Sequence, residues 1–103
     1  MGFYHMEHLF EPGKLLVSPG VINSGIDYQR LLLRHLAGDW GDISDYDADE
    51  NRRAVGADEA VLSQYHVKLS GGKSSILCIM TEMGRIHTVV FFLTENLVHH
   101  EPS

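Results

Sequence analysis

Residues 34–42 read Arg34-His35-Leu36-Ala37-Gly38-Asp39-Trp40-Gly41-Asp42, and this stretch decides how the chain is organised. The sequence before it is typical of a helix, and the sequence after it is typical of a capped helix followed by a sheet. Gly38 occupies the position that ends a helix, because glycine enters the left-handed backbone region without a Cβ penalty. Trp40 is the only tryptophan, and its large apolar ring predicts a lid over the core at this corner.

The residues on either side of the corner predict three helical segments. Tyr28, Leu32 and Leu36 recur four residues apart and form an apolar stripe, and we expect His35 beside this stripe to be partly buried. Acidic residues begin the segment after the corner and arginines end it, as the helix dipole favours. The predicted segments are one turn over residues 21–23 after Ser18-Pro19, a helix over 28–37 capped by Asp27, and a helix over 45–54 capped by Ser44 that ends at Val55-Gly56.

The C-terminal half predicts an antiparallel meander of three strands. Apolar and polar residues alternate over the first strand, the second is apolar on both faces, and the third is rich in β-branched and aromatic residues. Glycine-containing turns separate the three. The predicted strands are residues 61–69, 75–82 and 86–94, joined by turns at 70–73 and 83–85, and residues 14–17 form a strand or an extended edge segment.

The expected fold class is α+β, with two to three short N-terminal helices packed on a three- to four-stranded antiparallel meander. Residues 1–103 form one domain, divided into an N-terminal extension (1–12), a helical part (14–56), a β-meander (60–95) and a tail (96–103). We expect the two longer helices to cover one face of the sheet. The other face would show Val89, Phe91 and Leu93, or the alternate set, and either set is more apolar than a monomer needs. The N-terminal segment, a homodimer through the sheet face, or another partner would cover it.

Composition and charge exclude several classes of protein. The chain has 103 residues, 44% of them hydrophobic, and a formal net charge of −6. This acidity disfavours direct nucleic-acid binding, which needs clustered Lys and Arg. Cys78 is the single cysteine, so no internal disulfide can form, and we expect a cytoplasmic protein. No apolar run approaches the ~18 residues that a membrane helix requires, so we expect no membrane association.

The sequence contains no recognisable catalytic or metal-binding pattern. It has no Ser-His-Asp arrangement with a nucleophile elbow and no phosphate-binding glycine loop. Histidines near the two ends have no completing ligand at a recognisable spacing, so we expect neither a metal nor another cofactor. These terminal histidines are His5, His8, His99 and His100.

One enzymatic interpretation stays open. Small ribonuclease toxins also place helices before an antiparallel sheet and use histidines and basic residues on its face. The corresponding residues here are His66, Lys68, Arg85 and His87, a set that general acid–base cleavage of a phosphodiester could use. The acidic charge argues against this interpretation, because an RNA-facing surface is basic. The sequence therefore favours a binding protein over an enzyme.

Acidic residues crowd the corner and the helix after it. Six of them fall within the dozen residues 39–50, which contain no Lys or Arg. Capping of the corner and the helix explains this pattern, and an acidic surface that faces a basic protein partner explains it as well. The candidate partner-binding residues are Asp39, Trp40, Asp42, Asp45, Asp47, Asp49 and Glu50.

Several short motifs carry a resemblance to a family of small bacterial proteins found on plasmids and other mobile elements. The motifs are Ser18-Pro19-Gly20, Arg34-His35-x-x-Gly38-Asp39-Trp40-Gly41-Asp42, Asn51, Leu62-Ser63-x-Tyr65 and Ile79-x-Thr81-Glu82. The likeness covers roughly residues 14–95, but Leu77 or Cys78 and Val89-Val90 stand where the family usually has Trp and Thr-Thr. The resemblance supplies no catalytic residues.

The resemblance implies a mobile-element setting, in which small acidic proteins often inhibit host defence by blocking nucleic-acid-binding surfaces. Our hypothesis is therefore a non-enzymatic accessory or inhibitor protein of anti-restriction or anti-CRISPR type. Its partner would be a basic protein, such as a nucleic-acid-targeting defence complex. A small ribonuclease-type toxin and a structural homodimer are the alternatives.

Overall fold

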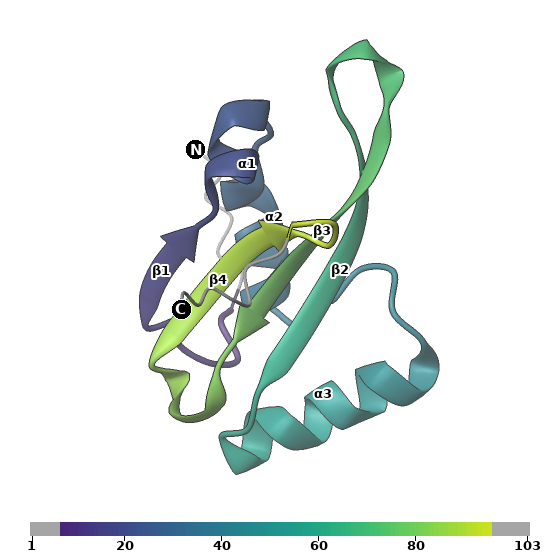
Figure 1. The fold of residues 1–103 in the computed structure, drawn as a ribbon. Helices are drawn as coiled ribbons and strands as arrows, with labels where there is room; N and C mark the ends of the chain where they lie inside the picture. Colours follow the sequence, from purple (N-terminus) through teal and green to yellow (C-terminus); the bar gives the residue numbers. More distant parts are fainter. Residues whose placement is uncertain (1–6, 96–103) are drawn as a thin grey trace, which may run out of the picture.

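The computed structural model describes residues 7–95, which form three α-helices and one four-stranded sheet (Figure 1). The helices are α1 (Pro19–Ser24), α2 (Tyr28–Leu36) and α3 (Asp45–Ala57). The strands are β1 (Lys14–Val17), β2 (Val61–Lys68), β3 (Ser74–Thr81) and β4 (His87–Phe92). The predicted α+β class is confirmed. The predicted tail (96–103) with His99 and His100, and residues 1–6 with His5, lie outside the described residues.

The four strands lie in the order β1-β4-β3-β2. Strands β2, β3 and β4 pair antiparallel through short turns, which confirms the predicted meander. Strand β1 runs parallel to β4, with Lys14 opposite His87 and Val17 opposite Val90, so the sheet is mixed and not antiparallel throughout. Most of the chain lies between β1 and β4, and no hairpin turn imposes their relative direction.

The predicted end of α2 at the corner is confirmed to within one residue. The helix ends at Leu36, and Gly38 follows with φ +90°. The Gly38 N–H donates to the carbonyl of His35 (3.2 Å), and the Asp39 N–H donates to that of Arg34 (2.9 Å). Together these bonds form a Schellman motif, which satisfies carbonyls that a helix end leaves free.

Helix α3 is longer than the sequence indicates, because it continues to Ala57. The prediction that it ends at Val55-Gly56 is wrong. Asp58 caps the helix with φ +61°, a left-handed conformation that Asp visits more readily than most residues. The Arg85 guanidinium, from the turn between β3 and β4, donates to two carbonyls of the last helical turn (3.1 and 3.4 Å). A contact from a distant part of the chain thus supports the helix past a glycine.

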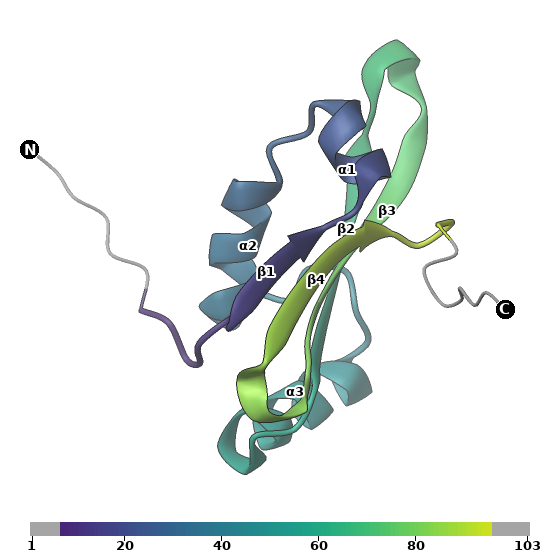
Figure 2. The same ribbon diagram turned by 60° about the vertical axis from the view of Figure 1, so that its left-hand side comes forward.

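Helices α1 and α2 cover one face of the sheet (Figure 2). Val21 of α1 is part of a buried cluster against which α2 packs, and the sheet supplies its other members, Tyr65, Leu77, Ile79, Val90 and Phe92. Helix α3 does not share this face, contrary to the expectation that the two longer helices cover it together. It lies alongside β2, because its buried residues pack on the corner and on the start of that strand.

Trp40 closes a second, smaller core between α2, α3 and the start of β2. Its side chain is 5% exposed and packs in a cluster with Phe10, Leu36, Ala54 and Val61. The predicted lid over the core is confirmed. Because Ala54 belongs to this cluster, the indole also anchors α3 to the body of the protein.

The opposite face of the sheet carries neither α1 nor α2, and apolar side chains lie next to one another across all four strands. Leu62 pairs with Met80, Met80 pairs with Val89, and Val89 pairs with Leu16. We call these four residues the apolar row. Leu62 is 38% exposed and Leu16 is 40% exposed. Of the two sets predicted for the outer face, the outward one is therefore the set with Val89 and Phe91.

His35 is fully buried, where partial burial was expected, and it links α2 to the sheet. Its Nδ1 lies 2.6 Å from the Ser63 hydroxyl and its Nε2 lies 2.9 Å from the Thr81 hydroxyl. Thr81 is bonded to Thr88 (2.6 Å), whose hydroxyl donates to the Pro12 carbonyl (2.7 Å). One chain of hydrogen bonds thus crosses β2, β3 and β4 and reaches the segment before β1.

The direction of this chain fixes the proton on His35. The single Thr88 proton is used on a carbonyl, so Thr81 donates to Thr88 and accepts from His35. His35 therefore carries its proton on Nε2, and its Nδ1 accepts from Ser63. Burial, and to a smaller extent the nearby Arg85 guanidinium, lower the pKa of His35 from 6.5 to about 3. The imidazole is consequently neutral in the folded protein.

The corner closes the free edge of β2. The Gln64 N–H donates to the Trp40 carbonyl (3.2 Å), and the Asp42 N–H donates to the Gln64 carbonyl (2.6 Å). A carboxylate oxygen of Asp42 accepts from the His66 N–H (2.9 Å). Backbone groups that an edge strand would offer to another strand are thereby occupied.

Gly41 lies where the corner approaches β2 most closely, so we expect Gly41→Ala to destabilise the fold strongly. Its φ is +77°, and an added Cβ would meet the Gln64 carbonyl oxygen and lie 2.5 Å from the Tyr65 ring. Gly25→Ala is the matched control, because Gly25 has φ +76° but no atom within 4 Å of an added Cβ. We expect about 1–2 kcal/mol of lost unfolding free energy for the control and clearly more for Gly41→Ala, measured by urea denaturation. Equal losses would contradict the close approach.

The depressed pKa of His35 predicts that the protein loses stability as the pH falls. Below pH 6.5 the unfolded chain protonates this imidazole, whereas the folded protein resists protonation down to about pH 3. The free energy of unfolding should therefore fall by about 2 kcal/mol between about pH 7.5 and about pH 5 through this residue alone. The measurement compares urea unfolding of the wild type and of His35→Gln over that range. An equal pH dependence in both proteins would show that His35 is not the group responsible.

Candidate functional site

The two aspartates of the corner are committed to local hydrogen bonds. The Arg34 guanidinium donates to both carboxylate oxygens of Asp39 (2.8 and 3.3 Å), and it also lies over the Tyr65 ring. The bond to Arg34 holds the pKa of Asp39 below its ordinary value. Asp42 faces the backbone and the ring of His66 (2.9 and 3.1 Å), and these hydrogen bonds lower the pKa of its carboxyl group. Both carboxylates therefore hold the corner together, and each side chain stays about half exposed (53 and 54%).

Trp40 offers a partner almost no side-chain surface, because the indole is buried. Its N–H forms no hydrogen bond with the described residues. The structure thus places Trp40 beneath the surface on which the sequence analysis had set it. Trp40 packs beneath the candidate site and is not one of the residues that a partner would contact.

The carboxylates of α3 divide into paired and unpaired groups. Asp49 and Glu50 each pair with the arginine three residues later on the exposed face of the helix. Asp45 and Asp47, in the first turn, form no ion pair with any residue in the range 7–95. A cation of another protein can therefore approach Asp45 and Asp47 without displacing an internal one.

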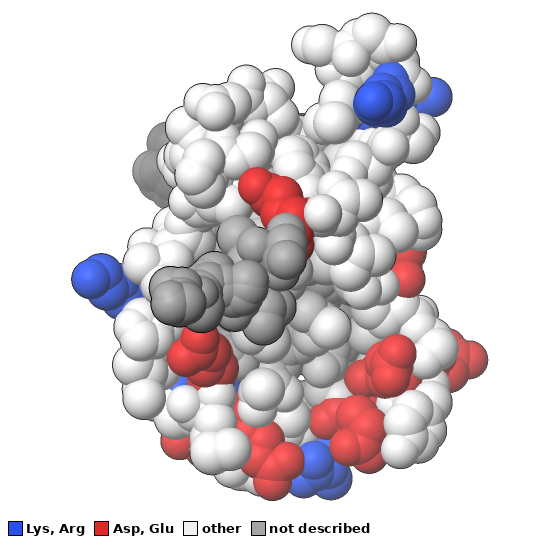
Figure 3. Space-filling view, viewed as in Figure 1, with Lys and Arg blue, Asp and Glu red and all other residues white. Residues whose placement is uncertain are grey.

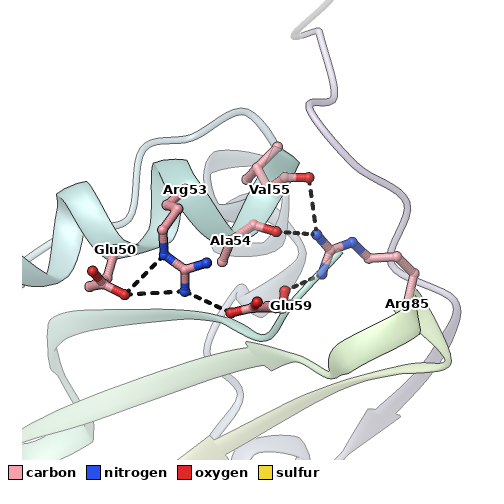
Figure 4. Close-up of polar contacts among 6 residues, drawn as sticks. All are labelled: Glu50, Arg53, Ala54, Val55, Glu59 and Arg85. Carbon is pink, nitrogen blue, oxygen red and sulfur yellow. Dashed lines mark hydrogen bonds and ion pairs between the residues drawn. The ribbon is translucent and has the colours of Figure 1, made fainter. Parts of the chain in front are cut away.

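Arg53 links α3 to the chain that follows it (Figure 4). Its guanidinium binds Glu59 (2.6 Å) and Glu50 (3.2 Å). The bonds to Glu59 and then to Glu50 raise the pKa of Arg53, and Arg53 in turn lowers the pKa of Glu59. One carboxylate oxygen of Glu50 therefore already accepts hydrogen bonds from Arg53.

Arg85 serves the structure of the protein, although the sequence analysis considered it for catalysis. Figure 4 shows its guanidinium against the backbone at the end of α3. It donates to the carbonyls of Glu59 (2.5 Å), Ala54 (3.1 Å) and Val55 (3.4 Å), and it lies 5.1 Å from the centre of the Phe10 ring. These contacts leave the Arg85 side chain only 10% exposed. It is not free to bind a phosphate.

The residues considered for a nuclease do not come together. His66 of β2 pairs with Ile76 of β3. The His87 carbonyl accepts from the N–H of Glu82, which lies six residues further along the chain than Ile76. At about 3.4 Å per residue, the two histidines lie about 20 Å apart, too far to act as acid and base on one phosphodiester. Within residues 7–95 no three His, Cys, Asp or Glu side chains form a group that could hold a metal ion.

A hollow of about 160 Å³ opens between α3 and the outward side of β2. Asn51 is buried beneath it, and its carboxamide bonds the N–H (3.2 Å) and the carbonyl (2.8 Å) of Leu62. These two bonds extend the closure of the β2 edge and hold the helix at a fixed distance from the strand. The hollow is lined by Ile43, Asp47, Glu50, Asn51, Leu62 and Gln64.

Most of the Asp and Glu side chains in view in Figure 3 lie toward the end of the molecule that carries α3, with Lys or Arg side chains among them. In that view Asp and Glu cluster over α3, while the hairpin between β2 and β3, which carries Lys68 and Lys73, protrudes at the far end. The hollow therefore lies in the negative part of the surface. One of its lining residues, Leu62, is also the first residue of the apolar row.

Sequence reasoning found the acidic half of this site and missed the rest. Asp47 and Glu50 were candidates, whereas the apolar residues Ile43 and Leu62 were not. A signal for Leu62 exists, because it is an apolar residue at an outward position of an alternating strand. No comparable signal marks Ile43, which enters the site only because the corner turns it toward β2.

The fold and the site define a small α+β protein in which an acidic helix borders the open side of a mixed sheet. Comparisons with protein-family models, with curated protein sequences and with solved structures found no match to the chain. The resemblance to plasmid and mobile-element proteins therefore stays a prediction. Among residues 7–95, no helix has both the length and the apolar character needed to cross a membrane.

Proposed function

We propose that this chain is a non-enzymatic accessory or inhibitor protein that docks on a basic surface of a larger protein through the start of α3. The docking surface consists of Ile43, Asp45, Asp47, Glu50 and Leu62. It is smaller than the set expected from the sequence, because the corner aspartates are bonded internally and the indole is buried.

The observation that carries the proposal is the exposure of two unpaired carboxylates beside an apolar surface. Asp45 and Asp47 lie in the first turn of α3, and neither has a cationic partner within residues 7–95. Leu62, which lines the same hollow as Asp47, is 38% exposed. Interfaces combine such apolar contacts with complementary charge, which accelerates association and selects the partner.

The proposed setting follows from charge and from the resemblance to mobile-element proteins. Nucleic-acid-targeting defence complexes of the kind that restriction and CRISPR systems use present basic surfaces to phosphate groups. A protein with a net charge of −6 can compete for such a surface. Counter-defence is therefore the setting in which we place the docking function.

Removal of the two unpaired charges should abolish capture of the basic partner. In Asp45→Asn/Asp47→Asn both charges are lost while the shape is kept, and the helix loses only about 0.3–1 kcal/mol per site from its dipole interaction. The measurement is capture from a lysate of bacteria that carry a DNA-targeting defence system, quantified by mass spectrometry at low and high salt. We expect the wild type to recover a basic nucleic-acid-binding protein, in a salt-sensitive manner, and the variant to recover at least about tenfold less.

The matched control is Glu7→Gln/Glu11→Gln, which removes the same charge from two exposed residues outside α3. This control should capture the partner as the wild type does. Equal losses in both double variants would mean that only net charge matters, and undiminished capture by the α3 variant would exclude the surface. Either result contradicts the proposal.

A further inference from the structure

We propose that the hollow between α3 and β2 receives one arginine side chain of the partner. This inference rests on the proposed docking function and names the chemistry of its anchor. The hollow combines two apolar residues, two acidic residues and two carboxamides. None of these groups alone indicates which ligand would bind, but their combination within a small volume does indicate it.

The size of the hollow favours a single side chain over a small-molecule ligand. Its volume is about 160 Å³. Pockets that enclose a cofactor or a drug-sized molecule measure about 300–1,000 Å³. A long side chain that enters from the partner is therefore the occupant that the volume permits.

The lining of the hollow requires an occupant that is apolar along its stem and cationic at its tip. Ile43 and Leu62 offer apolar surface for methylene groups. Asp47 offers a carboxylate that pairs with no cation in residues 7–95. Only the side chains of Lys and Arg have this build, because each places a charge at the end of a flexible hydrocarbon stem.

The choice of arginine over lysine follows from hydration and geometry. A guanidinium is planar, weakly hydrated and carries several donors in a fork, so it can bond Asp47 and the carboxamide oxygen of Gln64 together. An ammonium is a strongly hydrated point charge, which a half-apolar hollow solvates less well. Helix α3 already binds one guanidinium through a carboxylate, since one oxygen of Glu50 accepts from both Nε and a terminal nitrogen of Arg53 (3.3 and 3.2 Å).

The hollow exists before any partner binds, because Asn51 fixes its dimensions. The side chain of Asn51 bonds both backbone groups of Leu62, and the residue is only 6% exposed. A preformed site spends little free energy on ordering its own side chains when a ligand enters. Since Leu62 also begins the apolar row, a residue next to the arginine would contact the row, and an apolar residue suits that position.

The test is a titration of the isotope-labelled full chain with the dipeptide acetyl-Arg-Leu-amide, followed by NMR amide shifts. We expect saturable shifts at Asp47, at Leu62 and at the Asn51 side-chain amide. The citrulline analogue keeps the shape of arginine without its charge, and it should bind at least about tenfold more weakly. The lysine analogue should bind about threefold more weakly than the arginine dipeptide. Shifts elsewhere, or equal binding of the citrulline analogue, would overturn the inference.

Two variants of the same helix sharpen the test. Asp47→Asn keeps the backbone bond to the Ser44 cap and should weaken dipeptide binding at least about fivefold. Asp49→Asn removes the same charge outside the hollow and should leave the affinity unchanged. Wild-type affinity in Asp47→Asn, with both variants folded by circular dichroism, would also overturn the inference.

The outcome of this titration can be told apart from the outcome of lysate capture. Dipeptide binding in the hollow, together with capture that ignores Asp45 and Asp47, would remove the proposed function and leave the arginine site standing. Capture that depends on both aspartates, without dipeptide shifts in the hollow, would overturn the arginine site alone.

Discussion

The hydrogen bonds between the corner and the free edge of β2 position the rest of the molecule. The backbone of residues 40–42 bonds Gln64 on both of its polar groups, and this contact is possible because Gly41 has no side chain to separate the two segments. The same turn inserts Trp40 between α2, α3 and β2. It also sets where α3 begins, since the Ser44 cap follows two residues later. A closed sheet edge, a buried indole and the placement of the acidic helix are therefore consequences of a single turn.

This arrangement explains why the most distinctive motif of the sequence contributes little to the candidate site. Its aspartates and its histidine are occupied: Asp39 holds Arg34, Asp42 holds the edge of β2, and His35 lies in the buried chain to the Pro12 carbonyl. The side chains that remain available to a partner belong to other residues, which the motif holds in place. The hollow arises because the corner and Asn51 together set α3 at a fixed distance from β2.

Local patterns predicted the elements well, whereas contacts between distant residues lay beyond them. Periodicity and glycine placement located α2, the meander and the Schellman end at Gly38. The direction of β1, the burial of His35 and the cap that Arg85 provides each depend on a partner more than 25 residues away, which no spacing reveals. The pairing of Asp49 and Glu50 was readable, because arginines follow each of them at the i,i+3 spacing that places side chains together on a helix.

The reasons that separate the docking residues from the other acidic residues differ from case to case. Exposed ion pairs contribute about 0–1 kcal/mol, so Asp49 could exchange its arginine for that of a partner at little cost. Asp49 differs from Asp47 in position, since it does not line the hollow, and from Asp45 in its pairing with Arg52. Asp42 is excluded by energy and geometry together, because its carboxylate satisfies a backbone N–H of the sheet edge and its withdrawal would expose that edge. Asp47 meets neither objection: it lines the hollow, and its charge has only the helix dipole to lose. Apolar contact and available charge coincide at that residue, so the docking proposal depends on Asp47 more than on the charge of the whole helix.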